Sequence, residues 1–190
     1  MTNPEIAPNS ALLVIDVQKG FDDAAFWGPR NNPAAEANIA ALMDAWQATG
    51  RPVVIVRHAS VRPGSVLAPD HAGYALKDFV EERRYESLLV TKTVNSAFYG
   101  TPDLGDWLGG HGIGQLVVAG IQTNMCVETT ARMAGNLGYE VLVPLDATHT
   151  FDLAGPDGVS LTADQLATAT AVNLQGGGFA RVVTTADLLA

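Results

Sequence analysis

Residues 118–131, Val-Ala-Gly-Ile-Gln-Thr-Asn-Met-Cys-Val-Glu-Thr-Thr-Ala, decide the fold and indicate its chemistry. An apolar run leads into a Gly-Ile-Gln segment and then into apolar residues at helical spacing, which predicts a strand, a tight turn and a helix. Cys126 falls in the first helical turn, where Thr123 or Asn124 can cap the free amide groups. Unpaired amides and the helix dipole lower the pKa of such a thiol and favour a nucleophile, although most lone cysteines are small buried hydrophobic residues.

Strands and helices are predicted to alternate along the rest of the chain. Short apolar runs indicate strands at residues 11–15, 53–56, 88–90, 116–119, 141–143 and 182–183. Helical patterns occupy residues 33–50, 102–108, the segment from 124 onward, and 162–174. This alternation predicts an α/β fold, a three-layer α/β/α arrangement around a mainly parallel six-stranded sheet. Ligands bind beyond the carboxyl ends of such strands, where the irregular segments 19–32 and 59–77 can cover a pocket.

Two charged residues follow predicted strands directly. Asp16 ends the run Ala-Leu-Leu-Val-Ile-Asp, and Lys92 follows Leu-Leu-Val-Thr. Taken alone, Asp16 could cap a neighbouring turn and Lys92 could be a solvated surface lysine. Together they place a carboxylate and an amine at the same sheet edge as Cys126, where each charge can be the partner of the other.

These three residues are sufficient for acyl transfer. A thiolate attacks a carbonyl carbon, Asp16 can accept the thiol proton and return it to a leaving nitrogen, and Lys92 can stabilise both anions. Backbone N–H groups at the turn before the helix would face the oxyanion. Such chemistry needs no cofactor, so we expect none.

Composition limits the partners. The chain has 190 residues, 47% of them hydrophobic, and no linker divides it, so we expect one domain over residues 1–190 that assembles as a homo-oligomer, a dimer or tetramer. Its net charge of -9 excludes phosphate-backbone binding, and no apolar run spans a bilayer. We therefore expect no nucleic acid, no membrane and a cytoplasmic location. Cys126 is the single cysteine, which rules out an internal disulfide.

At these residues the sequence resembles the isochorismatase-like cysteine hydrolases, a superfamily that includes nicotinamidases, N-carbamoylsarcosine amidases, ureidoacrylate amidohydrolases and streptothricin hydrolases. The resemblance covers nearly the whole chain. It is carried, in the family order, by Asp-Val-Gln-Lys-Gly-Phe at 16–21, Lys92 with Ser-Ala-Phe at 96–98, and Gly-Ile-Gln-Thr-Asn-Met-Cys-Val at 120–127.

The resemblance implies a site. Asp16, Lys92 and Cys126 would form a catalytic triad that attacks an amide or ureido carbonyl and passes through a thioester. A cis peptide between Ile121 and Gln122 would direct the backbone N–H groups of Gln122 and Cys126 at the oxyanion. Substrate contacts are expected from Phe21, which matches a family position, and from the nearby residues Trp27, Asn95, Phe98 and Tyr99, all of which could equally be packing residues.

One departure from the family concerns metal binding. Nicotinamidases have an Asp-x-His element after the second strand that binds a divalent metal, whereas this chain has Val56-Arg57-His58. Without the carboxylate, and with the positive charge of Arg57, we expect no metal site, and nicotinamide hydrolysis is disfavoured. Family members that hydrolyse the enol ether isochorismate lack the cysteine, so Cys126 favours cleavage of a C–N bond.

Two hypotheses follow from the sequence. The first is an amidohydrolase acting on a small amide, lactam or ureido compound. The second is a catalytically idle relative that binds a ligand or acts as a thiol-based redox protein on the same fold.

Overall fold

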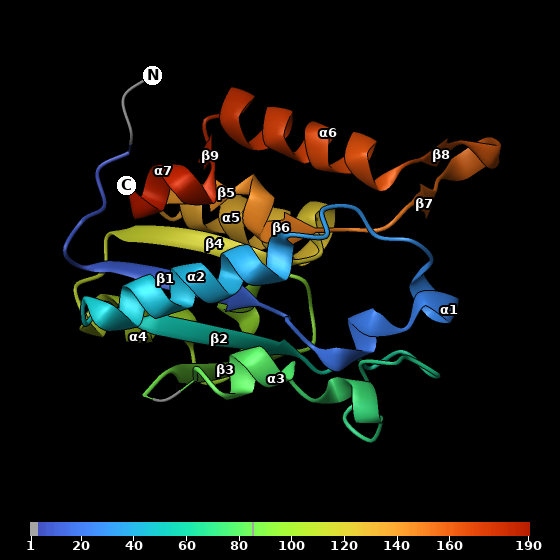
Figure 1. Cartoon of the computed structure of the whole chain (residues 1–190), viewed down its shortest axis with the longest axis horizontal. Helices are drawn as coiled ribbons and strands as arrows, with labels where there is room; N and C mark the ends of the chain where they lie inside the picture. Colours follow the sequence, from blue (N-terminus) through green and yellow to red (C-terminus); the bar gives the residue numbers. More distant parts are fainter. Residues whose placement is uncertain (1–3, 85) are drawn as a thin grey trace.

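The computed structural model describes residues 4–84 and 86–190, which form a three-layer α/β/α structure (Figure 1). The seven-stranded central sheet has the order β3-β2-β1-β4-β5-β9, with β6 pairing with β4, and every pairing in it is parallel. Its strands are β1 (Ser10–Ile15), β2 (Val53–His58), β3 (Leu88–Lys92), β4 (Gln115–Ile121), β5 (Glu140–Pro144), β6 (Thr148–His149) and β9 (Arg181–Val183).

All six predicted strands form, and the predicted α/β class is confirmed. The additional strand, β6, has only two residues and contains no apolar run, so its sequence carried no strand signal. Side chains of β1 alternate between two hydrophobic clusters: Leu12 and Val14 belong to one, and Leu13 and Ile15 to the other. A strand buried on both faces requires helices on both sides, which is the arrangement observed.

The first face of the sheet is covered by α2 (Ala35–Ala48), with the short helices α3 (Asp78–Glu81) and α7 (Thr185–Leu189). The second face is covered by α4 (Leu104–Gly110) and α5 (Glu128–Asn136), and α6 (Ala163–Gly176) packs beside α5 (Figure 1). The four predicted helices are thus present. The helices α3 and α7, and α1 (Ala24–Trp27), were not predicted, because four or five residues are too few to show a helical period.

The two irregular segments 19–32 and 59–77 pack against each other near the carboxyl ends of β1 and β2. They contain the short helices η1 (Lys19–Asp22) and η2 (Ala72–Tyr74). A Cβ atom added to Gly73 would lie 2.6 Å from the Cα of Gly20, so this close approach requires glycine. A small hairpin of β7 (Leu153–Ala154) and β8 (Ser160–Leu161) projects at the same end of the molecule as α1 (Figure 1).

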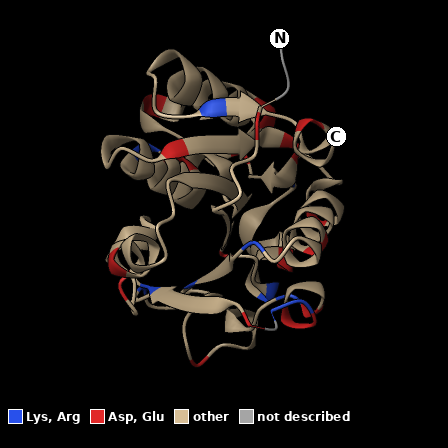
Figure 2. Ribbon diagram, turned by 90° about the vertical axis from the view of Figure 1, so that its left-hand side faces the viewer, with Lys and Arg blue, Asp and Glu red and all other residues tan. Residues whose placement is uncertain are grey.

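Charged residues lie mostly on the helices and loops (Figure 2). Most Lys and Arg side chains are paired with Asp or Glu. Within the described residues, every helix is too short or too polar to cross a membrane.

Candidate active site

The carboxylate of Asp16 is positioned by the end of β1. Asp16 has a positive φ of 52°, an uncommon conformation for a residue with a side chain, and its backbone N–H donates to the carbonyl of Val56 on β2 (2.9 Å). Gly120 on the neighbouring strand β4 also has a positive φ, and a Cβ there would collide with the backbone of Ile15. The backbone therefore turns sharply at this edge, and the Asp16 side chain reaches Lys92 on β3.

Lys92 forms a fully buried ion pair with Asp16. Its Nζ lies 2.6 Å from Oδ2 of Asp16, and neither side chain is exposed to solvent. The same Nζ lies 3.3 Å from Nδ1 of His58, the last residue of β2. Burial by itself lowers the pKa of Lys92, but the negative charge of Asp16, with that of a Cys126 thiolate, outweighs burial and holds the pKa above its usual value. Lys92 is therefore a cation.

His58 stays neutral in this position. Burial, followed by the adjacent Lys92 charge, lowers the pKa of His58 below its usual value. Because an ammonium group has no acceptor, Nδ1 must accept the hydrogen bond from Lys92. The imidazole thus helps to hold the ammonium group in place beside Asp16.

Cys126 lies in the turn η4 (Thr123–Val127), which leads directly into α5. The expected side-chain cap is wrong: the residue before the turn is Gln122, and no side chain caps it. Thr123 and Asn124 instead bond to Thr148 (2.8 Å) and Thr150 (2.5 Å) in the segment that begins with β6.

The expected lowering of the thiol pKa is also wrong for the free protein. Burial and then the charge of Asp16 raise the pKa of Cys126, and Lys92 offsets only part of this rise. The thiol is therefore protonated before a substrate binds. The expected cis peptide is present between Ile121 and Gln122.

The thiol, carboxylate and imidazole converge. One donor atom each from Asp16, His58 and Cys126 lies within 4.8 Å of the other two. The second carboxylate oxygen of Asp16, Oδ1, is buried and has no hydrogen-bond partner in the described part of the chain, so it is free to accept a proton. Such a donor set resembles a metal site, but the Lys92 ammonium already contacts two of its members. These groups therefore surround the ammonium group of Lys92 and not a metal ion.

A cavity of about 410 Å³ opens above Cys126. Of the residues expected to contact substrate, Phe21, Trp27 and Asn95 line it, and the Cys126 thiol lies 3.9 Å from Oδ1 of Asn95. This volume falls in the range of about 300–1,000 Å³ typical of small-molecule sites. A larger groove beside α6 and β9 contains none of the three candidate catalytic residues.

Phe98 and Tyr99 do not line this cavity, which corrects the expectation for both. Phe98 is buried in the core, where its ring packs 5.9 Å from that of Tyr139. Tyr99 is 69% exposed and borders a neighbouring depression, which shares Thr93 and Asn95 with the cavity. Both belong to the short helix η3 (Ala97–Tyr99).

The aromatic wall of the cavity was only partly predicted. The rings of Phe21 and Trp27 lie 5.0 Å apart, and that of Trp27 stacks on Phe151 at 5.3 Å. The edge of His149 contacts Phe151 in turn (5.5 Å). Phe151, 130 positions from Phe21, packs against Trp27 without lining the cavity, whereas Phe26, Met125 and Leu153 line it and were not predicted.

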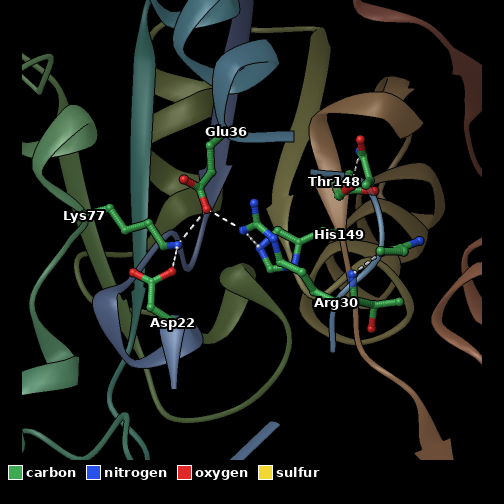
Figure 3. Close-up of polar contacts among 9 residues, drawn as sticks. Asp22, Arg30, Glu36, Lys77, Thr148 and His149 are labelled. Carbon is green, nitrogen blue, oxygen red and sulfur yellow. Dashed lines mark hydrogen bonds and ion pairs between the residues drawn. The ribbon is translucent and has the colours of Figure 1, made fainter. Parts of the chain in front are cut away.

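A partly buried polar network lies next to these rings, because it includes Asp22, the neighbour of Phe21 in η1, and His149, whose ring contacts Phe151 (Figure 3). Lys77 Nζ contacts Oε1 of Glu36 (2.7 Å) and a carboxylate oxygen of Asp22 (2.5 Å). Arg30 pairs with the same Glu36 and lies 3.2 Å from Nε2 of His149. Burial, and then the charges of Arg30 and Lys77, lower the pKa of His149 to about 3, so its ring is neutral. The network ties together η1, the start of α2, the end of segment 59–77, and β6.

The isochorismatase domain family matches residues 10–187. Streptothricin hydrolase from Streptomyces noursei is 37% identical over 164 residues, covering 85% of this chain and 62% of that protein. The ureidoacrylate amidohydrolase RutB from Variovorax paradoxus is 31% identical over 176 residues, covering 75% of this chain and 69% of that protein. A crystal structure of an isochorismatase-family protein from Chromobacterium violaceum has a TM-score of 0.90 and 42% identity, covering 97% of this chain and 94% of that one. The chain therefore belongs to the isochorismatase family and is a hydrolase of that family.

Proposed function

We propose that the protein hydrolyses a C–N bond in a small amide, lactam or ureido compound, with Cys126 as nucleophile and a thioester as intermediate. The observation that carries the proposal is the buried Asp16–Lys92 pair beside the thiol, at the floor of a cavity of small-molecule size. The relatives named for amidohydrolase and hydrolase activities support the same reaction class.

In the first half of the reaction, Cys126 Sγ attacks the substrate carbonyl carbon while its proton passes to the carboxylate of Asp16. The tetrahedral oxyanion accepts hydrogen bonds from the backbone N–H groups of Gln122 and Cys126. It then collapses, the C–N bond breaks, and Asp16 returns the proton to the leaving nitrogen. Ammonia or an amine departs, and the acyl group remains on the sulfur.

In the second half, water attacks the thioester carbonyl while Asp16 accepts a proton from it. Collapse breaks the C–S bond, the acid product leaves, and the proton returns to the sulfur. Lys92 stays positively charged and keeps Asp16 in place throughout. Phe21, Trp27 and Asn95 are the proposed substrate contacts. No step needs a cofactor.

Replacing Cys126 tests the assignment. Cys126→Ala should abolish ammonia or amine release from a panel of amides, lactams and ureido acids without changing the melting temperature by more than a few degrees. Cys126→Ser, with a poorer nucleophile, should retain only a trace of turnover. Mass spectrometry of a quenched reaction should find the acyl group on the only cysteine of the chain. Undiminished turnover in Cys126→Ala would contradict the nucleophile. A wild-type protein that hydrolyses nothing in the panel would favour an idle or thiol-redox relative.

The cytoplasmic location and the assembly as a dimer or tetramer are further parts of this proposal. Exposed apolar side chains on the β7–β8 hairpin and nearby, Leu153, Val159 and Leu161, are suited to an interface between copies. Sedimentation at two protein concentrations would show whether the chain is a monomer.

A further inference from the structure

Arg62 lines the candidate cavity with a guanidinium group that has no partner in the described part of the chain. It belongs to the segment 59–77, and its side chain is exposed. Each of the other Lys and Arg side chains interacts with another group, such as a carboxylate, an aromatic ring or a hydroxyl. A planar guanidinium left free at a binding cavity is suited to a carboxylate, which it binds through two parallel hydrogen bonds.

The backbone around Arg62 is held in place by hydrogen bonds. The N–H of Arg62 donates to Oγ of Ser60 (3.3 Å), and its carbonyl accepts from the N–H of Ser65 (3.2 Å). Ser60 N–H in turn donates to the carbonyl of Leu67 (3.1 Å). The base of the arginine side chain is therefore fixed, which lowers the entropy lost when it binds a ligand.

The charge balance of the cavity indicates the sign of the ligand. Among its described lining residues, Asp16 and Arg62 carry formal charges, and Lys92 neutralises Asp16. Burial and Lys92, with a smaller contribution from Arg62, lower the pKa of His58, which is therefore neutral and adds no charge. The cavity has one uncompensated positive charge in a protein whose net charge is -9. That local charge favours an anionic ligand over a cationic one.

We propose that the substrate is an amide or ureido compound that also carries a carboxylate, which Arg62 binds while Cys126 attacks the carbonyl. The inference rests on the proposed function. The apolar part of the substrate would pack on Phe21 and Trp27. A neutral amide of the same shape leaves Arg62 unpaired and gains nothing from it.

Matched pairs of acids and methyl esters test this inference. The probes are 4-carbamoylbenzoate with its methyl ester, and 3-ureidopropionate with its methyl ester, assayed by ammonia release. In the wild-type protein, kcat/KM should be about 10- to 100-fold higher for the acid in at least one pair, as expected of charge-assisted hydrogen bonds. Arg62→Gln should abolish this preference by slowing the acid and sparing the ester, and Arg62→Lys should keep part of it. The control is Arg84→Gln, which removes an exposed charge outside the cavity.

A second measurement does not depend on the choice of substrate. Iodoacetate carries a carboxylate where iodoacetamide carries a neutral amide. Both reagents alkylate the single cysteine, Cys126. The rate of alkylation by iodoacetate divided by the rate with iodoacetamide should fall in Arg62→Gln and stay unchanged in Arg84→Gln. Equal ratios in wild-type and Arg62→Gln proteins in both measurements would overturn the inference while leaving the proposed hydrolysis intact. A ratio of alkylation rates that depends on Arg62, without hydrolysis of any compound, would support the carboxylate site and refute the proposed hydrolysis.

Discussion

Replacing Lys92 by Met should destabilise the protein by about 3–5 kcal/mol, the usual effect of removing one partner from a buried ion pair. Methionine keeps the apolar stem of the side chain, so the change removes the charge and leaves little empty space. The Asp16 carboxylate then stays buried without the Lys92 ammonium, because both side chains of the pair are shielded from solvent. For a chain of this size each kcal/mol lowers the melting temperature by about 2–4 °C, so a fall of about 6–20 °C is expected.

The assay is urea or thermal unfolding followed by circular dichroism, with two comparison variants. Lys19→Met breaks an ion pair of the same 2.6 Å length, formed with Asp78, whose side chains are 44% and 79% exposed. It should cost less than about 1 kcal/mol. The double variant Asp16→Leu/Lys92→Met leaves no buried charge and should recover most of the lost stability.

The pH of the measurement matters because the pKa of Lys92 is raised in the folded protein. The stabilisation from this shift is complete below the ordinary lysine pKa and is lost as the pH rises through the folded value. Measurements near pH 7.5 therefore lie where the whole effect is present. Equal losses of stability in Lys92→Met and Lys19→Met, or a double variant no more stable than Lys92→Met, would refute the reasoning.

Three further predictions concern the surroundings of the proposed triad. Alkylation of Cys126 by iodoacetamide should be slow at pH 7 and faster in Asp16→Asn, because that carboxylate raises the thiol pKa; slower labelling of Asp16→Asn would contradict this. His58→Phe removes the acceptor for Lys92 and should lower kcat about tenfold, while His58→Gln should restore part of it, measured by steady-state kinetics on the best amide. Lys77→Met should lower the melting temperature and raise KM, because Lys77 connects two segments that cover the cavity. An unchanged KM would show that the polar network does not affect substrate binding.

The sheet, and the edge at which the candidate site residues meet, were predictable because the signals that define them are local. A run such as residues 11–15, apolar at every position, is buried on both faces; Asp16 follows β1 directly, and Lys92 is the last residue of β3. In a parallel sheet the carboxyl ends of all strands lie at the same edge, so chain position alone places these side chains together. The family resemblance supplied the cis peptide, which no spacing or composition could have indicated.

The cavity wall was not predictable in this way. Phe151, which packs against the cavity residue Trp27, lies far from it in the sequence, and the lack of a partner for the Arg62 guanidinium among the described residues is a property of the folded protein. Phe98 and Tyr99 were expected to contact substrate, but Phe98 lies in the core and Tyr99 is exposed outside the cavity. Proximity along the chain predicts contact on a strand or helix but not through a turn.

The protonated thiol and the buried ion pair are consistent with each other. In the free protein, Asp16 and Lys92 cancel and Cys126 is neutral, so the buried site has no net charge. In the proposed reaction the thiol proton moves to Asp16 as negative charge moves from its carboxylate to the oxyanion, and Lys92 stays positive, so the net charge is still zero. A site that began with a thiolate would have to bury an additional anion before any substrate had arrived, at a high cost in desolvation. The sulfur is therefore expected to become strongly nucleophilic only when a carbonyl group is in place, which links slow alkylation of the free enzyme to rapid acylation by the substrate.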